Sequence, residues 1–456
     1  MVAGSEENKM LTVETISTTE LGDRSYIAHD GAIAIVIDPQ RDIDRVESLL
    51  AQLELVCALV IETHIHNDYV TGGLVLAQRC GAIYAMAADA AVEFERHAVA
   101  NGDELTAGSL SVVVVATPGH TEDHLSYVVS DADGTAVVFT GGSLLYGSVG
   151  RTDLVDPAKT DELTHAQYRS VHHLAEMLPD ETSIYPTHGF GSFCSSGAAS
   201  GAQASTIGVE KQQNDALASH DEDDFVERLI AGLTAYPSYY AHMAPLNRRG
   251  PALADLSPPE PVNPVVLARR IHAGEWVVDL RTQRAFAKEH LGGTISIALG
   301  DQFSTYLGWL MPWGSPLTLI GEDPSVVAAA QRQLVRIGID RPDGAAVGSP
   351  RELAAGGVLR NYPAASFSEL ASAGEVGVLD VRRDDERAEG FVRGSLHIPI
   401  DELIGRMNEL PKERLWVHCA SGFRASIAAS LLDRVGHDVV LVDDDFANAA
   451  PLGLLS

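Results

Sequence analysis

The chain has 456 residues, of which 45% are hydrophobic, and a formal net charge of −31. At roughly 150 residues per domain, this length predicts about three domains, each large enough for its own core. The negative charge argues against a nucleic-acid backbone or an anionic membrane surface as a partner. The four unclustered cysteines show no disulfide framework, which favours a reducing cytoplasm. The first residues lack the features of a signal peptide, and no apolar run approaches the ~18 residues that a membrane span needs.

The first motif follows a predicted buried strand, Val56–Ile61. Two histidines and an aspartate come directly after it with the spacing H-x-H-x-D, at His64, His66 and Asp68. Alternate residues of an extended segment point to the same side, so these side chains are expected to face one rim of the fold. Imidazoles and a carboxylate suit zinc or iron(II), and the motif therefore predicts a metal site with an open coordination position. The alternative is a polar loop that happens to contain two histidines.

Two more histidines follow predicted strands. The apolar run 112–116 leads through a Pro-Gly turn to His120, and the segment Ser183–Pro186 leads to His188. Such strand ends are expected to present both imidazoles at the sheet edge where the first motif lies. His124 begins the next apolar run, so we interpret it as a hydrogen-bonded support for the site and not as a ligand.

This order of histidine-bearing strand ends resembles the metallo-β-lactamase fold over about residues 10–245. Within that superfamily, Phe139-Thr140-Gly141 and the segment from Gly150 to Leu154 are most similar to the persulfide dioxygenases. The resemblance implies an αββα sandwich whose site holds either two zincs or a single non-haem iron.

Two positions depart from the family pattern. The residue after the motif aspartate is usually a histidine but is Tyr69 here, and the residue after Phe-Thr-Gly is usually an aspartate but is Gly142 here. A second metal would depend on both missing ligands together with Asp68 and His188. The departures therefore favour one metal ion, with Asp68 and His188 as weaker candidate ligands.

The resemblance carries His64 and His120 over as ligands, whereas the carboxylate ligand of the persulfide dioxygenases is replaced by Gly142. His66 is expected to complete a three-histidine set around one ion, Fe(II) or, as the alternative, zinc. On this interpretation Gly142→Asp should strengthen metal binding. The opposing interpretation is a scaffold that has lost its metal.

The second motif follows another predicted strand, Leu415–His418, and leads into a predicted helix. A cysteine in a tight loop before a helix faces converging backbone N–H groups, which together with Arg424 favour the thiolate and would hold a persulfide or an oxyanion. The sequence C-x-x-G-x-R resembles the active loop of rhodanese sulfurtransferases, which implies that Cys419 accepts sulfur and Arg424 binds an anion. A buried, inert cysteine is the alternative. The remaining loop residues expected to contact the substrate are Ala420, Ser421, Gly422 and Phe423.

A repeat precedes this motif. The segment from Val278 to Arg281 aligns with the segment from Leu379 to Arg382 at an offset of 101 residues. This period predicts two copies of one α/β domain. In the first copy, Gly321 and Val326 take the positions of the cysteine and the arginine, so only the second copy is expected to catalyse.

Together these patterns predict a multidomain α/β protein. The expected domains are an αββα metallo-β-lactamase-like domain at residues 1–245, an inactive rhodanese-like domain at 264–345 and an active rhodanese domain at 364–456, the last two with parallel sheets. The proline-rich segment 245–264 is the expected linker.

This combination resembles the bacterial fusions of a persulfide dioxygenase with a sulfurtransferase. It implies oxidation of a low-molecular-weight thiol persulfide to sulfite at the metal, and sulfur transfer involving sulfite and thiosulfate through Cys419. Two alternatives stay open: a metal-dependent thioester hydrolase of the glyoxalase II type, and a scaffold with sulfurtransferase activity alone. The expected partners are these small molecules, with no nucleic acid or membrane, and a homo-oligomer is left open.

Overall fold

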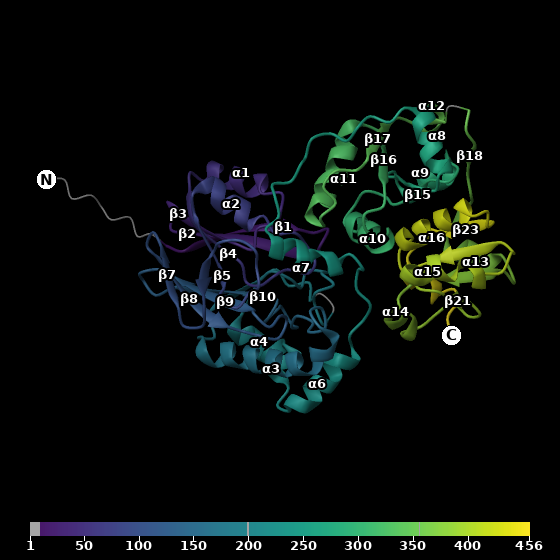
Figure 1. Ribbon diagram of the computed structural model, residues 1–456. Helices are drawn as coiled ribbons and strands as arrows, with labels where there is room; N and C mark the ends of the chain where they lie inside the picture. Colours follow the sequence, from purple (N-terminus) through teal and green to yellow (C-terminus); the bar gives the residue numbers. More distant parts are fainter. Residues whose placement is uncertain (1–9, 198–199, 355) are drawn as a thin grey trace. The chain divides into compact units, whose positions relative to one another are not determined.

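The computed structural model describes residues 10–197, 200–354 and 356–456, and its ribbon is drawn in Figure 1. The chain divides into two units. The first unit consists of Met1–Leu233, Tyr239–Ala254 and Val335–Gly338, and the second of Thr234–Ser238, Asp255–Leu334 and Ile339–Ser456. Within the described ranges, no helix is both long enough and apolar enough to cross a membrane.

The first unit contains two six-stranded sheets. One sheet has the order β1-β2-β3-β4-β5-β6 and the other the order β12-β11-β10-β9-β8-β7. The strands of the first are β1 (Thr12–Thr18), β2 (Asp23–His29), β3 (Ile33–Ile37), β4 (Val56–Ile61), β5 (Ile83–Ala87) and β6 (His97–Val99). The strands of the second are β7 (Glu104–Ala107), β8 (Leu110–Ala116), β9 (Leu125–Ser130), β10 (Ala136–Gly141), β11 (Ser183–Pro186) and β12 (Ser205–Thr206).

Helices cover the outer faces of these sheets. Figure 1 shows α1 and α2 beside the first sheet and α3, α4 and α6 beside the second. The helices of this unit are α1 (Asp44–Gln52), α2 (Gly73–Cys80), α3 (Thr160–Met177), α4 (Ile207–Gln213), α5 (Asp215–Ala218), α6 (Glu222–Ala231) and α7 (Tyr240–Arg249), with a 3-10 turn at Pro157–Lys159. Ile35 and Val60 of one sheet share a buried core with Val112 and Tyr127 of the other. The layers are those of an αββα sandwich, as the sequence predicts.

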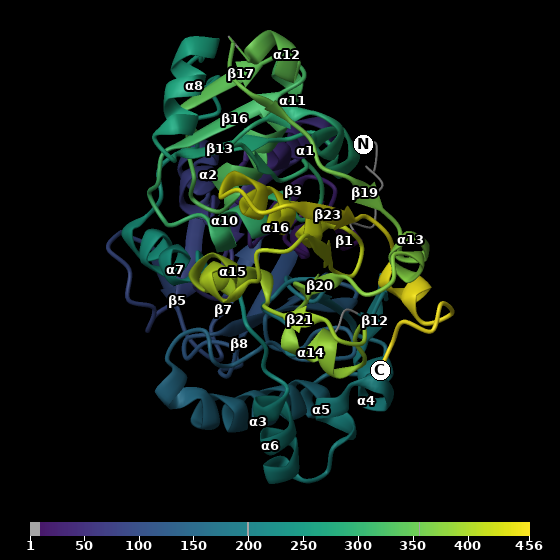
Figure 2. The ribbon, with the colours of Figure 1, turned by 90° about the vertical axis from the view of Figure 1, so that its right-hand side faces the viewer.

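The second unit contains two larger sheets whose strands are all parallel, one of four strands in the order β15-β13-β16-β17 and one of five in the order β19-β23-β22-β20-β21. Figure 2 shows β13, β16 and β17 lying side by side. The strands are β13 (Trp276–Asp279), β15 (Ile295–Ser296), β16 (Leu317–Gly321), β17 (Gly344–Val347), β19 (Ala364–Ala365), β20 (Gly377–Asp380), β21 (Leu396–His397), β22 (Leu415–His418) and β23 (Val439–Val442). A further antiparallel pair is formed by β14 (His290–Leu291) and β18 (Leu359–Arg360).

Several helices of the second unit begin at residues that favour helix starts. Asn263 caps α8 with its side chain, and Ser366 and Glu369 form a capping box at α13. The helices are α8 (Pro264–His272), α9 (Gln283–Lys288), α10 (Phe303–Leu310), α11 (Pro324–Arg336), α12 (Pro350–Leu353), α13 (Phe367–Ser372), α14 (Asp384–Ala388), α15 (Ile400–Arg406) and α16 (Phe423–Arg434), with 3-10 turns at Met407–Glu409 and Phe446–Ala449.

The sequence repeat is a structural repeat as well. Asp279 ends β13 and Asp380 ends β20, and each strand is paired with the strand that follows it in its own sheet. Arg281 and Arg382 each fold back to hydrogen-bond the aspartate two residues before them. The repeated Asp-x-Arg motif is therefore a buried ion pair at the carboxyl end of an equivalent strand.

Candidate functional site

The histidines of the first unit lie at the ends of strands from both sheets. His64 and His66 follow β4, His120 follows β8 and His188 follows β11. All four are buried, with at most 3% of each residue exposed. The two sheets thus deliver four imidazoles to the interior of the sandwich.

Three of these imidazoles form a set of the right size for a metal ion. The ligand atoms of His64, His120 and His188 lie within 4.8 Å of one another, and the Nε2 atoms of His64 and His188 are 3.3 Å apart. Burial lowers the pKa of His64 far below its ordinary value and that of His120 to about 3, which leaves both of these rings neutral, the form that binds metals. Although burial opposes protonation of His188, Asp68 and Asp23 raise its pKa to about 10, so this ring must release a proton when it binds a metal ion. The Nε2 atom of His120 is buried without a hydrogen-bond partner among the described residues. Such an orphaned nitrogen costs free energy unless a ligand satisfies it, so the set fits a metal ion.

His66 lies differently from what its spacing predicts. Its Nε2 atom is 3.0 Å from the Tyr69 hydroxyl, 3.2 Å from a Glu62 oxygen and 3.4 Å from an Asp38 oxygen. Although burial opposes protonation, Asp38 and Glu62 raise the pKa of His66 to about 9. The structure therefore places His188, a weaker candidate in the sequence, beside His64 and His120 in the position expected of His66. Tyr69 helps to hold His66 away from the ligand set, because the Tyr69 hydroxyl contacts the ring nitrogen of His66.

A carboxylate also reaches this region. Asp68 and Asp23 hold Nδ1 of His188, at 3.2 and 2.9 Å, which directs its Nε2 atom toward His64. His66, Asp68 and His188 form a second set with potential ligand atoms within 4.8 Å. One oxygen each of Asp23 and Asp68 is buried without a hydrogen-bond partner in the part of the chain that the structure describes. Asp68 therefore brings a carboxylate next to His188 of the ligand set, although position 142 offers none.

The space beside Gly142 is filled by His120. A Cβ atom on Gly142 would lie 2.2 Å from Cδ2 of His120, and one on Gly150 would lie 2.8 Å from Nδ1 of the same ring. Nδ1 of His120 donates to the carbonyl of Arg151 at 2.7 Å, which leaves Nε2 as the acceptor. The expectation that Gly142→Asp would strengthen metal binding stays a prediction, and the packing at Gly142 weighs against it because the new side chain would have to displace His120. His124 supports the site as expected, since its Nε2 accepts the Gly142 amide at 2.9 Å.

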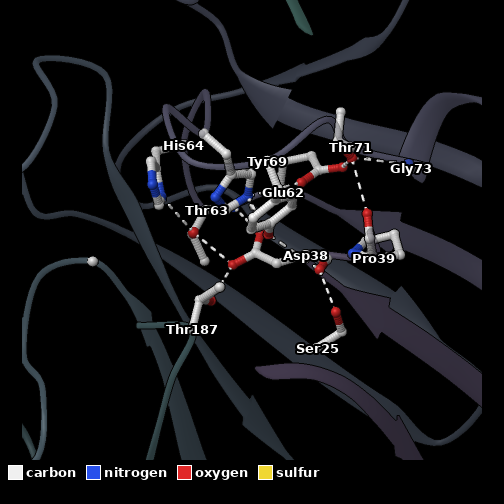
Figure 3. Close-up of polar contacts among 12 residues, drawn as sticks. Ser25, Asp38, Pro39, Glu62, Thr63, His64, Tyr69, Thr71, Gly73 and Thr187 are labelled. Atoms are coloured by element: carbon white, nitrogen blue, oxygen red, sulfur yellow. Dashed lines mark hydrogen bonds and ion pairs between the residues drawn. The ribbon is translucent and has the colours of Figure 1, made fainter. Parts of the chain in front are cut away.

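Sequence reasoning missed a buried acidic pair behind the histidines, drawn in Figure 3. Asp38 accepts the Thr63 amide and hydroxyl, each at 2.7 Å, and the Thr187 hydroxyl as well. Glu62 accepts the Thr71 hydroxyl, and burial raises the pKa of Glu62 to about 7. Asp38 follows the apolar strand β3 directly, so the strand-end rule that identified the histidines could have identified it too.

A pocket is lined by sequence neighbours of these histidines. It has a volume of about 290 Å³, and its wall includes Ile65, Asn67 and Thr121. Arg248 of α7 contributes from another element. The Asn67 side-chain nitrogen and Nε of Arg248 are buried without hydrogen-bond partners among the described residues. These two donors suit a carbonyl or carboxylate group, whereas Asp89, Glu122 and Asp123 in the same wall suit a positively charged group, so the pocket fits a ligand that carries both.

The cysteine motif of the second unit forms a tight loop between β22 and α16. Cys419 is buried, and its sulfur accepts the Gly422 amide at 3.2 Å. Gly422 has a φ of 92°, and a Cβ there would lie 2.3 Å from an Asp443 oxygen, so only glycine fits. The Ala420 carbonyl accepts the Phe446 amide, Ser421 is exposed and Phe423 begins α16. The loop thus directs an amide at the sulfur, as expected for a rhodanese-like loop.

Arg424 lies in a different arrangement from that of a free anion binder. Its side chain is buried, and its two terminal nitrogens donate to the two carboxylate oxygens of Glu386 at 2.5 and 2.6 Å. Although burial opposes ionisation, these hydrogen bonds hold the pKa of Glu386 below its ordinary value. In the first repeat, Gly321 ends β16, the counterpart of β22, and offers no nucleophile.

Comparisons with known proteins match both parts of the chain. Residues 363–449 match the family described as rhodanese-like domain. The chain is 31% identical over 176 residues to the mitochondrial persulfide dioxygenase ETHE1 of Homo sapiens, a match that covers 38% of this chain and 63% of that protein. The chain thus spans less than two thirds of that relative's length.

Two further relatives extend the comparison. A hydroxyacylglutathione hydrolase of Prochlorococcus marinus is 30% identical over 190 residues, which cover 40% of this chain and 71% of that protein. The crystal structure of a metallo-β-lactamase from Staphylococcus aureus is similar with a TM-score of 0.68 and 26% identity, over 75% of this chain and all of that one. The chain therefore belongs to the metallo-β-lactamase family that includes persulfide dioxygenases and hydroxyacylglutathione hydrolases, and it carries a rhodanese-like domain fused to that part.

Proposed function

We propose that this chain is a persulfide dioxygenase joined to a sulfurtransferase. The first unit would convert a low-molecular-weight thiol persulfide, O2 and water into the thiol and sulfite, and the second would transfer sulfur through Cys419. The observation that carries the proposal is the buried set of His64, His120 and His188, whose orphaned ring nitrogen fits one metal ion. An iron ion held there would supply the redox chemistry that O2 requires.

The surrounding residues would keep the imidazoles in place. The Arg151 carbonyl fixes the tautomer of His120, and the carboxylates of Asp23 and Asp68 orient His188. Because these groups are already in position before substrate arrives, little reorganisation would be needed on binding.

The pocket beside the histidines would receive the thiol carrier. Asn67 and Arg248 offer buried donors that lack protein partners among the described residues, and both are suited to a carboxylate of the carrier. Asp89, Glu122 and Asp123 of the same wall would suit an ammonium group of the carrier. A volume of about 290 Å³ admits a small molecule or part of one. This agrees with a low-molecular-weight persulfide as the substrate.

Sulfur transfer would occur at Cys419. Its sulfur accepts a hydrogen bond from the Gly422 amide, just before α16, which orients the sulfur in the loop. The Cys419 sulfur would attack the outer sulfur of a donor, form a persulfide and release the rest of the donor as sulfite or a thiolate.

A thioester hydrolase is the second candidate function. It is favoured by the similarity to a hydroxyacylglutathione hydrolase and by the second ligand set of His66, Asp68 and His188. Tyr69 and Gly142 weigh against it, because neither supplies the ligand that a two-metal site of this family uses.

One experiment separates the candidates. Metal content of the purified chain would be measured together with O2 uptake on glutathione persulfide and hydrolysis of a hydroxyacylglutathione thioester. One iron per chain with O2 uptake supports the dioxygenase. Two zincs with thioester hydrolysis, or neither activity, contradicts it.

A further inference from the structure

The ion pair between Arg424 and Glu386 joins the cysteine loop to helix α14. Arg424 is the second residue of α16, and Glu386 lies in the middle of α14. The pair is bidentate, with both terminal nitrogens of the guanidinium committed to one carboxylate at 2.5 and 2.6 Å. Only 8% of the Arg424 side chain and 22% of the Glu386 side chain are exposed. A pair of this geometry and burial is costly to separate, since either group would be left with an uncompensated charge.

The other cations near the loop are paired too. Arg382 and Arg387 both donate to Asp380, and Arg383 donates to Asp385. Arg382 also lies over the ring of Phe446, whose amide donates to the loop carbonyl of Ala420.

Asp443, whose carboxylate lies against Gly422, is paired with Arg284. A doubly charged donor entering the loop would therefore compete with a carboxylate for each of these guanidinium groups.

Two donor classes place different charges in this site. With thiosulfate, the Cys419 thiolate attacks the outer sulfur, the new S–S bond forms, the bond to the sulfonate sulfur breaks and sulfite leaves with two negative charges. With a thiol persulfide, the same attack yields the Cys419 persulfide and releases a thiolate with one negative charge, while the proton stays on the transferred sulfur. Atoms and electrons balance in both steps without another reactant. The first step needs a free cation far more than the second does.

We propose that Glu386 selects the donor at Cys419: by holding the Arg424 guanidinium, it disfavours thiosulfate and leaves the loop to a thiol persulfide. This inference rests on the proposed sulfurtransferase function and names its donor class. Glu386 would act through Arg424 and would not touch the reacting sulfur atoms.

The test measures sulfur transfer to cyanide from thiosulfate and from glutathione persulfide, using the full chain. The unaltered chain should have a higher kcat/KM with the persulfide. Glu386→Gln keeps the shape but removes the charge, so it should raise kcat/KM for thiosulfate about tenfold, mainly by lowering KM. The value for the persulfide should change less than about twofold. Glu402→Gln is the matched control, because Glu402 pairs with Arg406 in the exposed part of α15 and should alter neither value.

The possible results separate the role of Glu386 from the proposed function of Cys419. If Glu386→Gln leaves thiosulfate transfer unchanged or lowers it, Glu386 only positions Arg424 for anion binding and the inference is overturned. A preference of the unaltered chain for thiosulfate would overturn it as well, even if the variant failed to fold. If the unaltered chain transfers sulfur from neither donor, the proposed function of Cys419 fails instead.

Discussion

His120 packs directly against the backbone of Gly142, so that a Cβ on Gly142 would lie 2.2 Å from Cδ2 of the imidazole. Gly150 confines the ring further, since a Cβ there would lie 2.8 Å from Nδ1. The ring of His120 thus fills the space that a side chain at position 142 would need. The absence of the aspartate that related enzymes carry at this position is therefore coupled to the placement of His120.

We expect Gly142→Ala to lower metal content several-fold, because the added methyl group must displace His120 from the ligand set. Gly142→Asp should do the same and should not restore binding. Metal content by elemental analysis of the purified variants checks this. Gly232→Ala is the control, since its Cβ would meet only ordinary contacts at 3.4 Å and beyond. Raised metal content in Gly142→Asp would show that His120 yields to the new carboxylate.

His64→Ala and His188→Ala should each remove the metal and all oxygen-dependent activity. Both residues contribute Nε2 atoms to the same set, 3.3 Å apart, and a site with two remaining imidazoles holds an ion poorly. His173→Ala on the exposed side of α3 should keep full occupancy. Full metal occupancy in His188→Ala would instead indicate that His66 is the third ligand.

Cys419→Ser should abolish sulfur transfer to cyanide from every donor while metal content and persulfide oxidation stay unchanged. The serine oxygen is a weaker nucleophile, and the histidines of the proposed metal site lie in the other unit of the chain. Donor-dependent thiocyanate formation and O2 uptake, measured on the same preparation, check both parts. Residual transfer would have to come from elsewhere, and Gly321 of the first repeat offers no nucleophile for it.

Arg248→Gln should raise KM for glutathione persulfide about tenfold and leave kcat nearly unchanged, because a lost charge-assisted hydrogen bond weakens binding more than chemistry. Steady-state O2 uptake measures both constants. The matched control is Arg249→Gln, one residue further along α7 and exposed. Equal KM values for the two variants would exclude Arg248 from the substrate pocket.

The second unit should lose stability in acid through Asp380. Although burial opposes ionisation, hydrogen bonds from Arg382 hold the pKa of Asp380 below its ordinary value. A group whose pKa is lower in the folded state stabilises the fold above its unfolded pKa, and this stability is lost as the pH falls through the folded value. Unfolding by urea should therefore require less denaturant below about pH 4 than at pH 7.

Removing this carboxylate tests the same ion pair at neutral pH. Asp380→Asn should destabilise the second unit by about 3 kcal/mol at pH 7, since it leaves buried guanidinium groups without a counter-charge. The variant should also show a shallower acid dependence. Asp384→Asn, at a position whose side chain is 86% exposed, should behave like the unaltered chain.

Several parts of this protein could be predicted from local patterns in the sequence. The sequence shows three such patterns: apolar runs that end in histidine, a cysteine between a strand and a helix, and a repeat of Asp-x-Arg. Each depends only on residues close together in the chain, at the ends of strands and the starts of helices. They therefore predicted the strand ends that carry His64, His120 and Cys419, and the family resemblance that these motifs carry implied the αββα layers and the parallel sheets.

Tertiary structure decided which side chains meet. Alternation places His64 and His66 on one side only while the segment is extended, but the chain leaves the strand conformation after Ile61. His66 then contacts Asp38, Glu62 and Tyr69, and His188 comes from the other sheet to complete the ligand set.

Two further contacts also depend on tertiary structure: the ion pair between Glu386 and Arg424, and the packing of the His120 ring against Gly142. Glu386 precedes Arg424 by 38 positions, and His120 precedes Gly142 by 22. Contacts across such separations follow from how strands and helices pack, and packing is set by the shapes and charges of all the surrounding residues at once. No local period in the sequence encodes them.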